Sequence, residues 1–170
     1  HEGFSRTVAA LDEHKRLIGS GSSIMRDNQY HLMKGLLRPN DTRSEYAKIT
    51  SVFTPKPMQG MSEHIYQFPR TFDDGSVSFV EQIREGLNTA AKLDKVYYVG
   101  EFTGPTTAFG DFEAVRKHFD AYYSEGVQLS LIWNYALKGD VEWSFTADSD
   151  NGRYAFEEIR RFNDRVRNSE

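Results

Sequence analysis

The stretch KVYYVGEFTGP, Lys95–Pro105, has the pattern of one buried strand that ends in a charged side chain. The residues from Val96 to Gly100 are β-branched, aromatic or small, as a buried strand requires. Glu101 follows where the strand should end, and a turn rich in glycine, threonine and proline comes next. A carboxylate in this position is either a solvated loop residue or a group placed for chemistry.

Strand-like and helix-like segments alternate on both sides of this stretch. The expected strands cover residues 16–21, 58–67, 95–102 and 127–136. The expected helices cover residues 4–17, 42–53, 76–94, 111–126 and 154–167. Four strands, each followed by a helix, predict an α/β fold of four βα units with parallel strands and right-handed crossovers. Two architectures fit: half of a (β/α)8 barrel, and an open doubly wound sheet.

Side chains that cap helices set the expected helix starts. In chain order they are Asp41 or Thr42, Ser76, Asp111, and Asp150 or Asn151. Pro55 and Pro57 should end the first of these capped helices, because proline cannot continue a helix. Residues 22–40 and 137–152 are expected to be loops.

Composition and charge exclude several classes of function. With 170 residues the chain suits a single domain over residues 1–170. Its net charge of −4 gives no reason to expect nucleic acid or an anionic membrane as a partner. The absence of cysteine excludes disulfides and a thiolate nucleophile. Aromatic residues make up 14% of the chain, which suits a sugar-binding surface and, equally, an aromatic core.

In both architectures, functional side chains gather at the carboxyl ends of the strands. These ends carry Ser20–Ser22, Glu63–Tyr66, Glu101 and Trp133–Tyr135. His64 and Tyr66 are two residues apart and should share a face of their strand, while Glu101 should continue the row of Tyr97 and Val99. Hydrogen bonds from His64 and Tyr66 could keep Glu101 ionised, as a nucleophile must be.

Each of these side chains also has a structural interpretation. A glutamate just after a strand is often a solvated loop residue or a helix cap. His64 and Tyr66 would serve equally well as a hydrogen-bonded pair in a core, and Trp133 in an apolar strand would serve as a core residue. From the residues alone, both interpretations stay open.

Other motifs are weaker. The Gly19–Gly21 turn lacks the following helix that a phosphate-binding loop requires, and residues 148–152 lack the ligand spacing of a calcium loop. Four histidines show no metal-ligand spacing on one expected element: His14, His31, His64 and His118. No metal or cofactor is therefore expected.

The ordered set of strand ends resembles glycoside hydrolase family 5, the cellulase and mannanase family of retaining (β/α)8 barrels. That family carries a His-x-Tyr on its sixth strand, the nucleophilic glutamate in a Gly-Glu-aromatic setting on the seventh, and a tryptophan ending the eighth. The matching segments here are HIY (His64–Tyr66), VGEF (Val99–Phe102) and LIWNY (Leu131–Tyr135). LDEHKRLIGSG (Leu11–Gly21) is similar to the approach to the fifth strand. The resemblance covers nearly the whole chain and implies strands five to eight.

By this resemblance, Glu101 would be the nucleophile of a retaining β-glycosidase acting on a polysaccharide or oligosaccharide. Tyr66 would hydrogen-bond to its carboxylate, and His64 would contact the sugar or the acid/base. The implied substrate-binding residues are Trp133, Asn134 and Trp143. No cofactor is implied, and a secreted or periplasmic location would follow.

The resemblance also identifies what this chain lacks. Retaining hydrolysis needs two carboxyl groups about 5–5.5 Å apart, and in this family the acid/base is a glutamate after an asparagine on the fourth strand. No Asn-Glu pair occurs in the sequence. Glu63 is a conceivable substitute, but as the strand neighbour of His64 it should face away.

A half barrel has unpaired strand edges and an exposed inner face. We therefore expect a second copy or an N-terminal half barrel to complete it, and little or no activity from the chain alone. The alternative is a non-catalytic carbohydrate-binding or interaction domain that keeps a relic of the site. The doubly wound alternative would need a phosphate-binding loop or an acidic cluster on the first strand, and neither is seen in the sequence.

Overall fold

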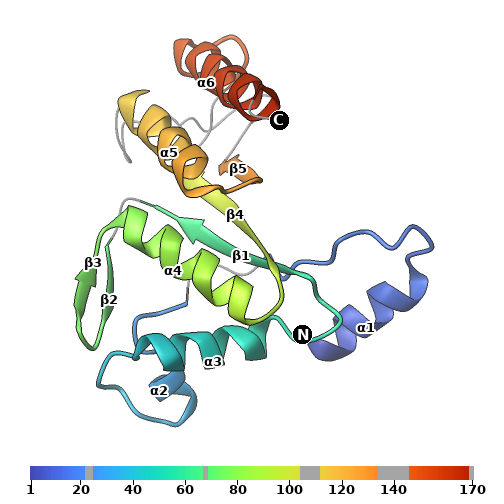
Figure 1. Cartoon of the computed structure of the whole chain (residues 1–170), viewed down its shortest axis with the longest axis vertical. Helices are drawn as coiled ribbons and strands as arrows, with labels where there is room; N and C mark the ends of the chain where they lie inside the picture. Colours follow the sequence, from blue (N-terminus) through green and yellow to red (C-terminus); the bar gives the residue numbers. More distant parts are fainter. Residues whose placement is uncertain (22–24, 67–68, 104–111, 134–145, 169–170) are drawn as a thin grey trace.

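The structure is a computed structural model, which describes residues 1–21, 25–66, 69–103, 112–133 and 146–168 (Figure 1). Its helices are α1 (Glu2–Leu11), α2 (Gln29–Met33), α3 (Arg43–Phe53), α4 (Phe79–Lys92), α5 (Phe112–Glu125) and α6 (Asp150–Arg167). Its strands are β1 (Gly60–Ile65), β2 (Arg70–Phe72), β3 (Gly75–Val77), β4 (Val96–Thr103) and β5 (Ser130–Trp133).

The main sheet has the order β1-β4-β5, and both pairings are parallel. A fourth strand position lies beside β1, where Gly19 forms a parallel bridge with Gly60 and the Ile18 carbonyl accepts from the amides of Gln59 and Gly60. The four positions therefore follow one another in chain order, each followed by a helix. This order is that of consecutive barrel strands, whereas a doubly wound sheet reverses at a switch point. The predicted fold class, half of a (β/α)8 barrel, is confirmed.

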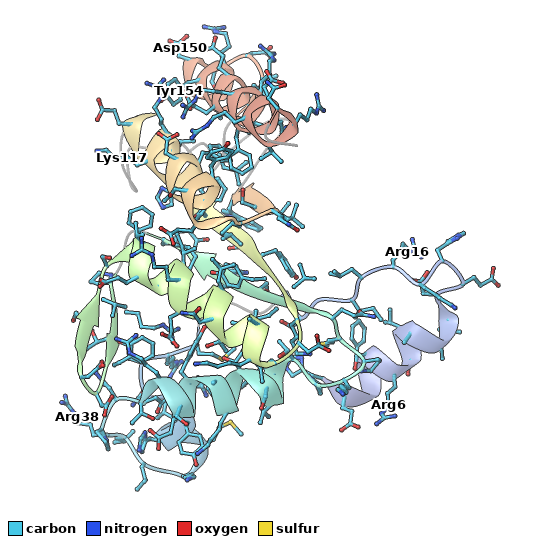
Figure 2. The ribbon with its side chains drawn as sticks, viewed as in Figure 1. Arg6, Arg16, Arg38, Lys117, Asp150 and Tyr154 are labelled. Atoms are coloured by element: carbon cyan, nitrogen blue, oxygen red, sulfur yellow. The ribbon has the colours of Figure 1, made fainter. Side chains whose placement is uncertain are left out.

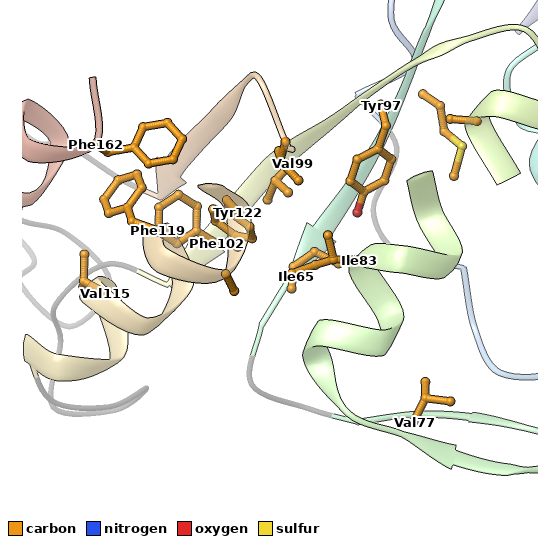
Figure 3. Close-up of a cluster of buried hydrophobic side chains, with 14 of the residues drawn as sticks. Ile65, Val77, Ile83, Tyr97, Val99, Phe102, Val115, Phe119, Tyr122 and Phe162 are labelled. Atoms are coloured by element: carbon orange, nitrogen blue, oxygen red, sulfur yellow. The ribbon is translucent and has the colours of Figure 1, made fainter. Parts of the chain in front are cut away.

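The core lies between the sheet and the helices that follow its strands (Figure 3). Ile65 of β1 and Ile83 of α4 are both fully buried. At the other end of the core, Phe102 of β4 is fully buried, and its ring meets those of Phe119 and Tyr122 on α5 edge to face. Such aromatic pairs add about 0.5–1.5 kcal/mol each beyond their burial. The helices thus cover the face of the sheet that would be outermost in a barrel.

Ion pairs connect each helix of this layer to the next. Arg43 of α3 contacts Glu85 of α4 at 3.2 Å. Arg84 of α4 binds Glu125 of α5 with two hydrogen bonds of 2.7 and 2.8 Å. Arg116 of α5 contacts Glu158 of α6 at 2.7 Å. The separations in sequence are 42, 41 and 42 residues, about the length of one βα unit.

The segment before α4 differs from the prediction. Instead of one helix over residues 76–94, strands β2 and β3 form an antiparallel hairpin, and Ser76 lies within β3. The helix begins after Ser78, whose hydroxyl accepts from the Glu81 amide while the Glu81 carboxylate accepts from the Ser78 amide. Ser78, not Ser76, is therefore the cap, because only Ser78 forms this reciprocal capping box.

The other helix starts are partly as expected. Thr42 caps α3 with a capping box, as predicted. Asp41 instead accepts hydrogen bonds from the Tyr30 amide and the His31 ring. The cap of α6 is Ser149, not Asp150 or Asn151, because its hydroxyl accepts from the Gly152 amide. Asp111 lies outside the described residues.

Two predicted segments are shorter than expected. The strand expected at residues 16–21 is reduced to the Gly19 bridge, and the helix expected at residues 4–17 ends at Leu11. The predicted loop at residues 22–40 contains the short helix α2. As predicted, α3 ends before Pro55.

Helix α1 lies apart from the helix layer (Figure 1), and its labelled Arg6 points away from the sheet (Figure 2). Its side chains Phe4 and Leu11 are 68% and 77% exposed. Within the described residues, no helix is both long enough and apolar enough to cross a membrane.

The capping assignment can be tested with two serines that lie two residues apart. Ser78→Ala should lower the free energy of unfolding by about 1 kcal/mol, because it removes the cap of α4. Ser76→Ala, on the exposed face of β3, should cost less than about 0.5 kcal/mol. Urea unfolding of both variants measures the difference, and equal losses would contradict the capping box.

Candidate functional site

One extra residue in β4 decides which way Glu101 points. Along β1, Glu63 and His64 are consecutive, but their partners on β4 are Val99 and Glu101. Along β5, two steps from Ser130 correspond to three steps on β4. Both neighbours therefore identify one additional residue between Val99 and Phe102, which is a β-bulge.

The bulge reverses the alternation that the sequence analysis assumed. The Tyr97 hydroxyl donates to Glu63 on one face of the sheet, whereas Glu101 contacts His64 on the other. Because Glu63 and His64 are neighbours on a strand, these two faces are opposite. The expectation that Glu101 continues the row of Tyr97 and Val99 is therefore wrong, and Glu101 lies on the inner face of the half barrel.

Glu101 is held by two side chains of the β1 segment. The Tyr66 hydroxyl donates to Glu101 Oε2 at 2.7 Å, and His64 Nδ1 lies 3.0 Å from the same oxygen. The side chains of His64 and Glu101 are 14% and 23% exposed, so the cluster is shielded yet reachable. Burial first, and then the bond to the carboxylate, raise the pKa of Tyr66, so its hydroxyl stays a donor. The expected grouping is present, and its catalytic roles stay predictions.

Glu63 occupies the opposite environment. It is 2% exposed, accepts hydrogen bonds from the Tyr46 and Tyr97 hydroxyls, and lies 4.0 Å from Arg70. Burial raises its pKa, although Arg70 and the two hydroxyls oppose the shift. As expected, it faces away from His64, and it belongs to the layer between sheet and helices.

Trp133, at the end of β5, lies on the same face as Glu101. Its neighbour Ile132 pairs with Phe102 and packs against the core, so alternation turns Trp133 to the inner face. The Trp133 side chain is 44% exposed. The other predicted substrate-binding residues, Asn134 and Trp143, lie outside the described residues.

Tyr98 is an inner-face residue of β4 that was not predicted from the sequence. The Tyr98 ring lies across the two strands on one side of β4: a Cβ on Gly19 would be 2.4 Å from its hydroxyl oxygen, and a Cβ on Gly60 would be 3.1 Å from its ring. Glycine at both positions is what makes room for the ring. The sequence feature that could have indicated this packing is a tyrosine in an apolar strand, Tyr98, together with a glycine in each of the two preceding strand segments, Gly19 and Gly60.

Within the described residues, one group of side chains could hold a metal ion: His31, Asp41 and Glu45, whose ligand atoms lie within 4.8 Å of one another. Each carboxylate already has a structural role. Asp41 accepts from two backbone amides of α2, and Glu45 completes the capping box of α3. These bonds explain the cluster without an ion.

Comparisons with known proteins identify a similar fold. No protein-family model matches the sequence, and a search of curated proteins found no match. Among solved structures, the chain is similar to the endo-1,4-beta-mannanase from Rhizomucor miehei, with a TM-score of 0.64 and 14% identity. The match covers 95% of this chain and 44% of that chain, so this chain spans less than half the length of its structural neighbour. That neighbour is a (β/α)8 barrel, and at this identity the likeness establishes the fold alone.

The contrast between the two glutamates is testable by stability. Glu63→Ala should cost about 3 kcal/mol, because it leaves two buried hydroxyls without their acceptor and the buried Arg70 without a nearby carboxylate. Glu101→Ala should change the free energy of unfolding by less than about 1 kcal/mol, since its side chain is partly exposed. Urea unfolding at neutral pH measures both, and a larger loss for Glu101→Ala would contradict this division.

Proposed function

We propose that this chain is the nucleophile-bearing half of a retaining β-glycosidase, with Glu101 as the nucleophile. The observation that carries the proposal is the position of Glu101, at the carboxyl end of β4 on the inner face, with Tyr66 and His64 on one carboxylate oxygen. The resemblance to glycoside hydrolase family 5 and the likeness in fold to a mannanase support it.

In this mechanism, Glu101 attacks the anomeric carbon of the sugar and forms a glycosyl-enzyme intermediate. Because Tyr66 and His64 both contact Oε2 of Glu101, the attacking oxygen in this mechanism is Oε1. The raised pKa of Tyr66 keeps its hydroxyl protonated, so it can orient the carboxylate and stabilise its charge. The group that protonates the leaving oxygen comes from outside this chain.

The proposed substrate is a β-linked polysaccharide or oligosaccharide of the mannan or cellulose type. Trp133 supports this class because an exposed indole at a strand end can stack under the apolar face of a pyranose ring. Asn134 and Trp143 are proposed as further sugar contacts on the strength of the family resemblance alone.

The proposed partner is a complementary half barrel. Among the described strands, β5 pairs with β4 on one side, and Leu131 and Trp133 are 49% and 44% exposed. A groove of about 320 Å³ lies beside β5, lined by side chains of α5 and α6 that include Phe119 and Phe162. At the opposite end of the sheet, α1 presents exposed Phe4 and Leu11. A further set of βα units would cover both regions.

A non-catalytic carbohydrate-binding domain is the second candidate. It is favoured by the exposed Trp133 beside Glu101 and by the lack of an Asn-Glu pair in the sequence. In this alternative the chain binds an oligosaccharide, and Glu101 never forms a covalent bond.

A substrate that needs no protonation separates the two candidates. In a 2,4-dinitrophenyl 2-deoxy-2-fluoro-β-glycoside of cellobiose or mannobiose, the phenolate leaves with its electron pair and without a proton. The Glu101 oxygen forms the bond to the anomeric carbon, and the fluorine slows hydrolysis of the intermediate. Mass spectrometry should find one added fluoroglycosyl group, mapped to the peptide that contains Glu101.

Two variants control this experiment. Glu101→Gln should abolish labelling, because an amide is a poor nucleophile, whereas Glu63→Gln should keep it, because Glu63 faces the helices. If the folded protein binds cellobiose or mannobiose in solution but stays unlabelled, the binding-domain candidate is correct and the glycosidase proposal fails.

The open edge can be tested by light scattering. The isolated chain should self-associate as its concentration rises, because exposed apolar strand edges pair with other copies. Leu131→Lys should reduce this association, while Leu37→Lys, at an exposed leucine outside the sheet, should not. A monomer at every concentration would count against a partner on this edge.

A further inference from the structure

We infer that Gly100 is a positioning residue for the candidate site, an inference that rests on the proposed role of Glu101. It combines two properties of one position. Gly100 belongs to the bulge that turns Glu101 to the inner face, and its missing side chain leaves the space in which the His64 imidazole lies.

The first property follows from the register. Val99 and Phe102 are three residues apart, yet both are fully buried. In a regular strand, residues three apart lie on opposite faces, and only an extra residue lets both reach the core. The same extra residue directs Glu101, between them, away from the core and toward His64.

The second property follows from contacts. A Cβ at position 100 would lie 3.3 Å from Cδ2 and 3.4 Å from Nε2 of His64, and 3.3 Å from Cβ of Ser62. These distances are tighter than ordinary van der Waals contact, so the imidazole would have to move by a few tenths of an ångström. His64 Nδ1 is 3.0 Å from Glu101 Oε2, and a displacement of that size would weaken this contact.

Gly100 therefore acts on Glu101 through His64. The imidazole lies against the place that a Cβ at position 100 would take, and its Nδ1 is 3.0 Å from Oε2 of Glu101. The Tyr66 hydroxyl reaches the same oxygen, whereas the three atoms nearest to a Cβ at position 100 belong to His64 and Ser62. A side chain at position 100 should therefore disturb the support from His64 first.

The test is the imidazole spectrum of His64 in protein labelled with ¹⁵N-histidine, assigned by the signal lost in His64→Gln. In the unaltered chain, Nδ1 should carry the proton that is shared with Glu101, and Glu101→Gln should remove this signature. Gly100→Ala should shift the His64 signals in the same direction. Gly3→Ala, where a Cβ meets nothing within 4 Å, should leave them unchanged.

An unchanged His64 spectrum in folded Gly100→Ala would overturn the inference. If that variant folds but is too unstable for the spectrum to be recorded, the melting temperature (Tm) is compared in backgrounds with and without the His64 ring. Gly100→Ala should then lower Tm less when combined with His64→Ala than it does alone, because the two residues are coupled through contact. An equal loss in both backgrounds would place the effect in the strand and overturn the inference as well.

These readouts need no sugar and no turnover. A chain in which His64 responds to Gly100→Ala but Glu101 is never labelled would keep the positioning role and reject the proposed nucleophile. If Glu101 is labelled but the His64 signals do not respond to Gly100→Ala, the proposed nucleophile is kept and the positioning role of Gly100 is rejected.

Discussion

The central strand β4 pairs with β1 and β5 at once, and one extra residue near Gly100 sets which of its side chains face the core and which face the inner side. The register of β4 shifts by one residue against both β1 and β5, and both shifts fall between Val99 and Phe102. Before the bulge, Tyr97 and Val99 serve the core, and after it Phe102 does so again. The helix-facing side of β4 is thus buried both before and after the bulge, while Glu101 points away from it.

Two glutamates at neighbouring strand positions illustrate how environment assigns roles. Glu63 lies among tyrosine hydroxyls and Arg70 in the helix-facing layer, where burial raises its pKa. Glu101 is partly exposed, and Tyr66 and His64 hold its carboxylate from the β1 segment. A carboxylate suited to chemistry is the one that solvent and a ligand can reach, and the sheet separates these two by turning them to opposite faces.

Much of this arrangement could be predicted from sequence, and the failures have local causes. Apolar runs and helical periodicity identified the four βα units, and the strand ends identified His64, Tyr66 and Glu101. The hairpin before α4 was missed although the turn Asp73–Gly75 is a typical hairpin signal. The predicted orientation of Glu101 relative to Tyr97 was wrong, because simple alternation assumes a regular strand. The extra residue in β4 is visible only in its pairing with the neighbouring strands.

The ion pairs between successive helices have a consequence for how the molecule forms. Arg43–Glu85, Arg84–Glu125 and Arg116–Glu158 join residues 41 or 42 positions apart, and the Tyr66–Glu101 bond spans 35. Long-range order is thus built from nearest-neighbour units, so the entropy lost in closing each loop stays modest. A chain of this kind can acquire native structure one unit at a time as it emerges during synthesis, with each new helix fastened to the one before it.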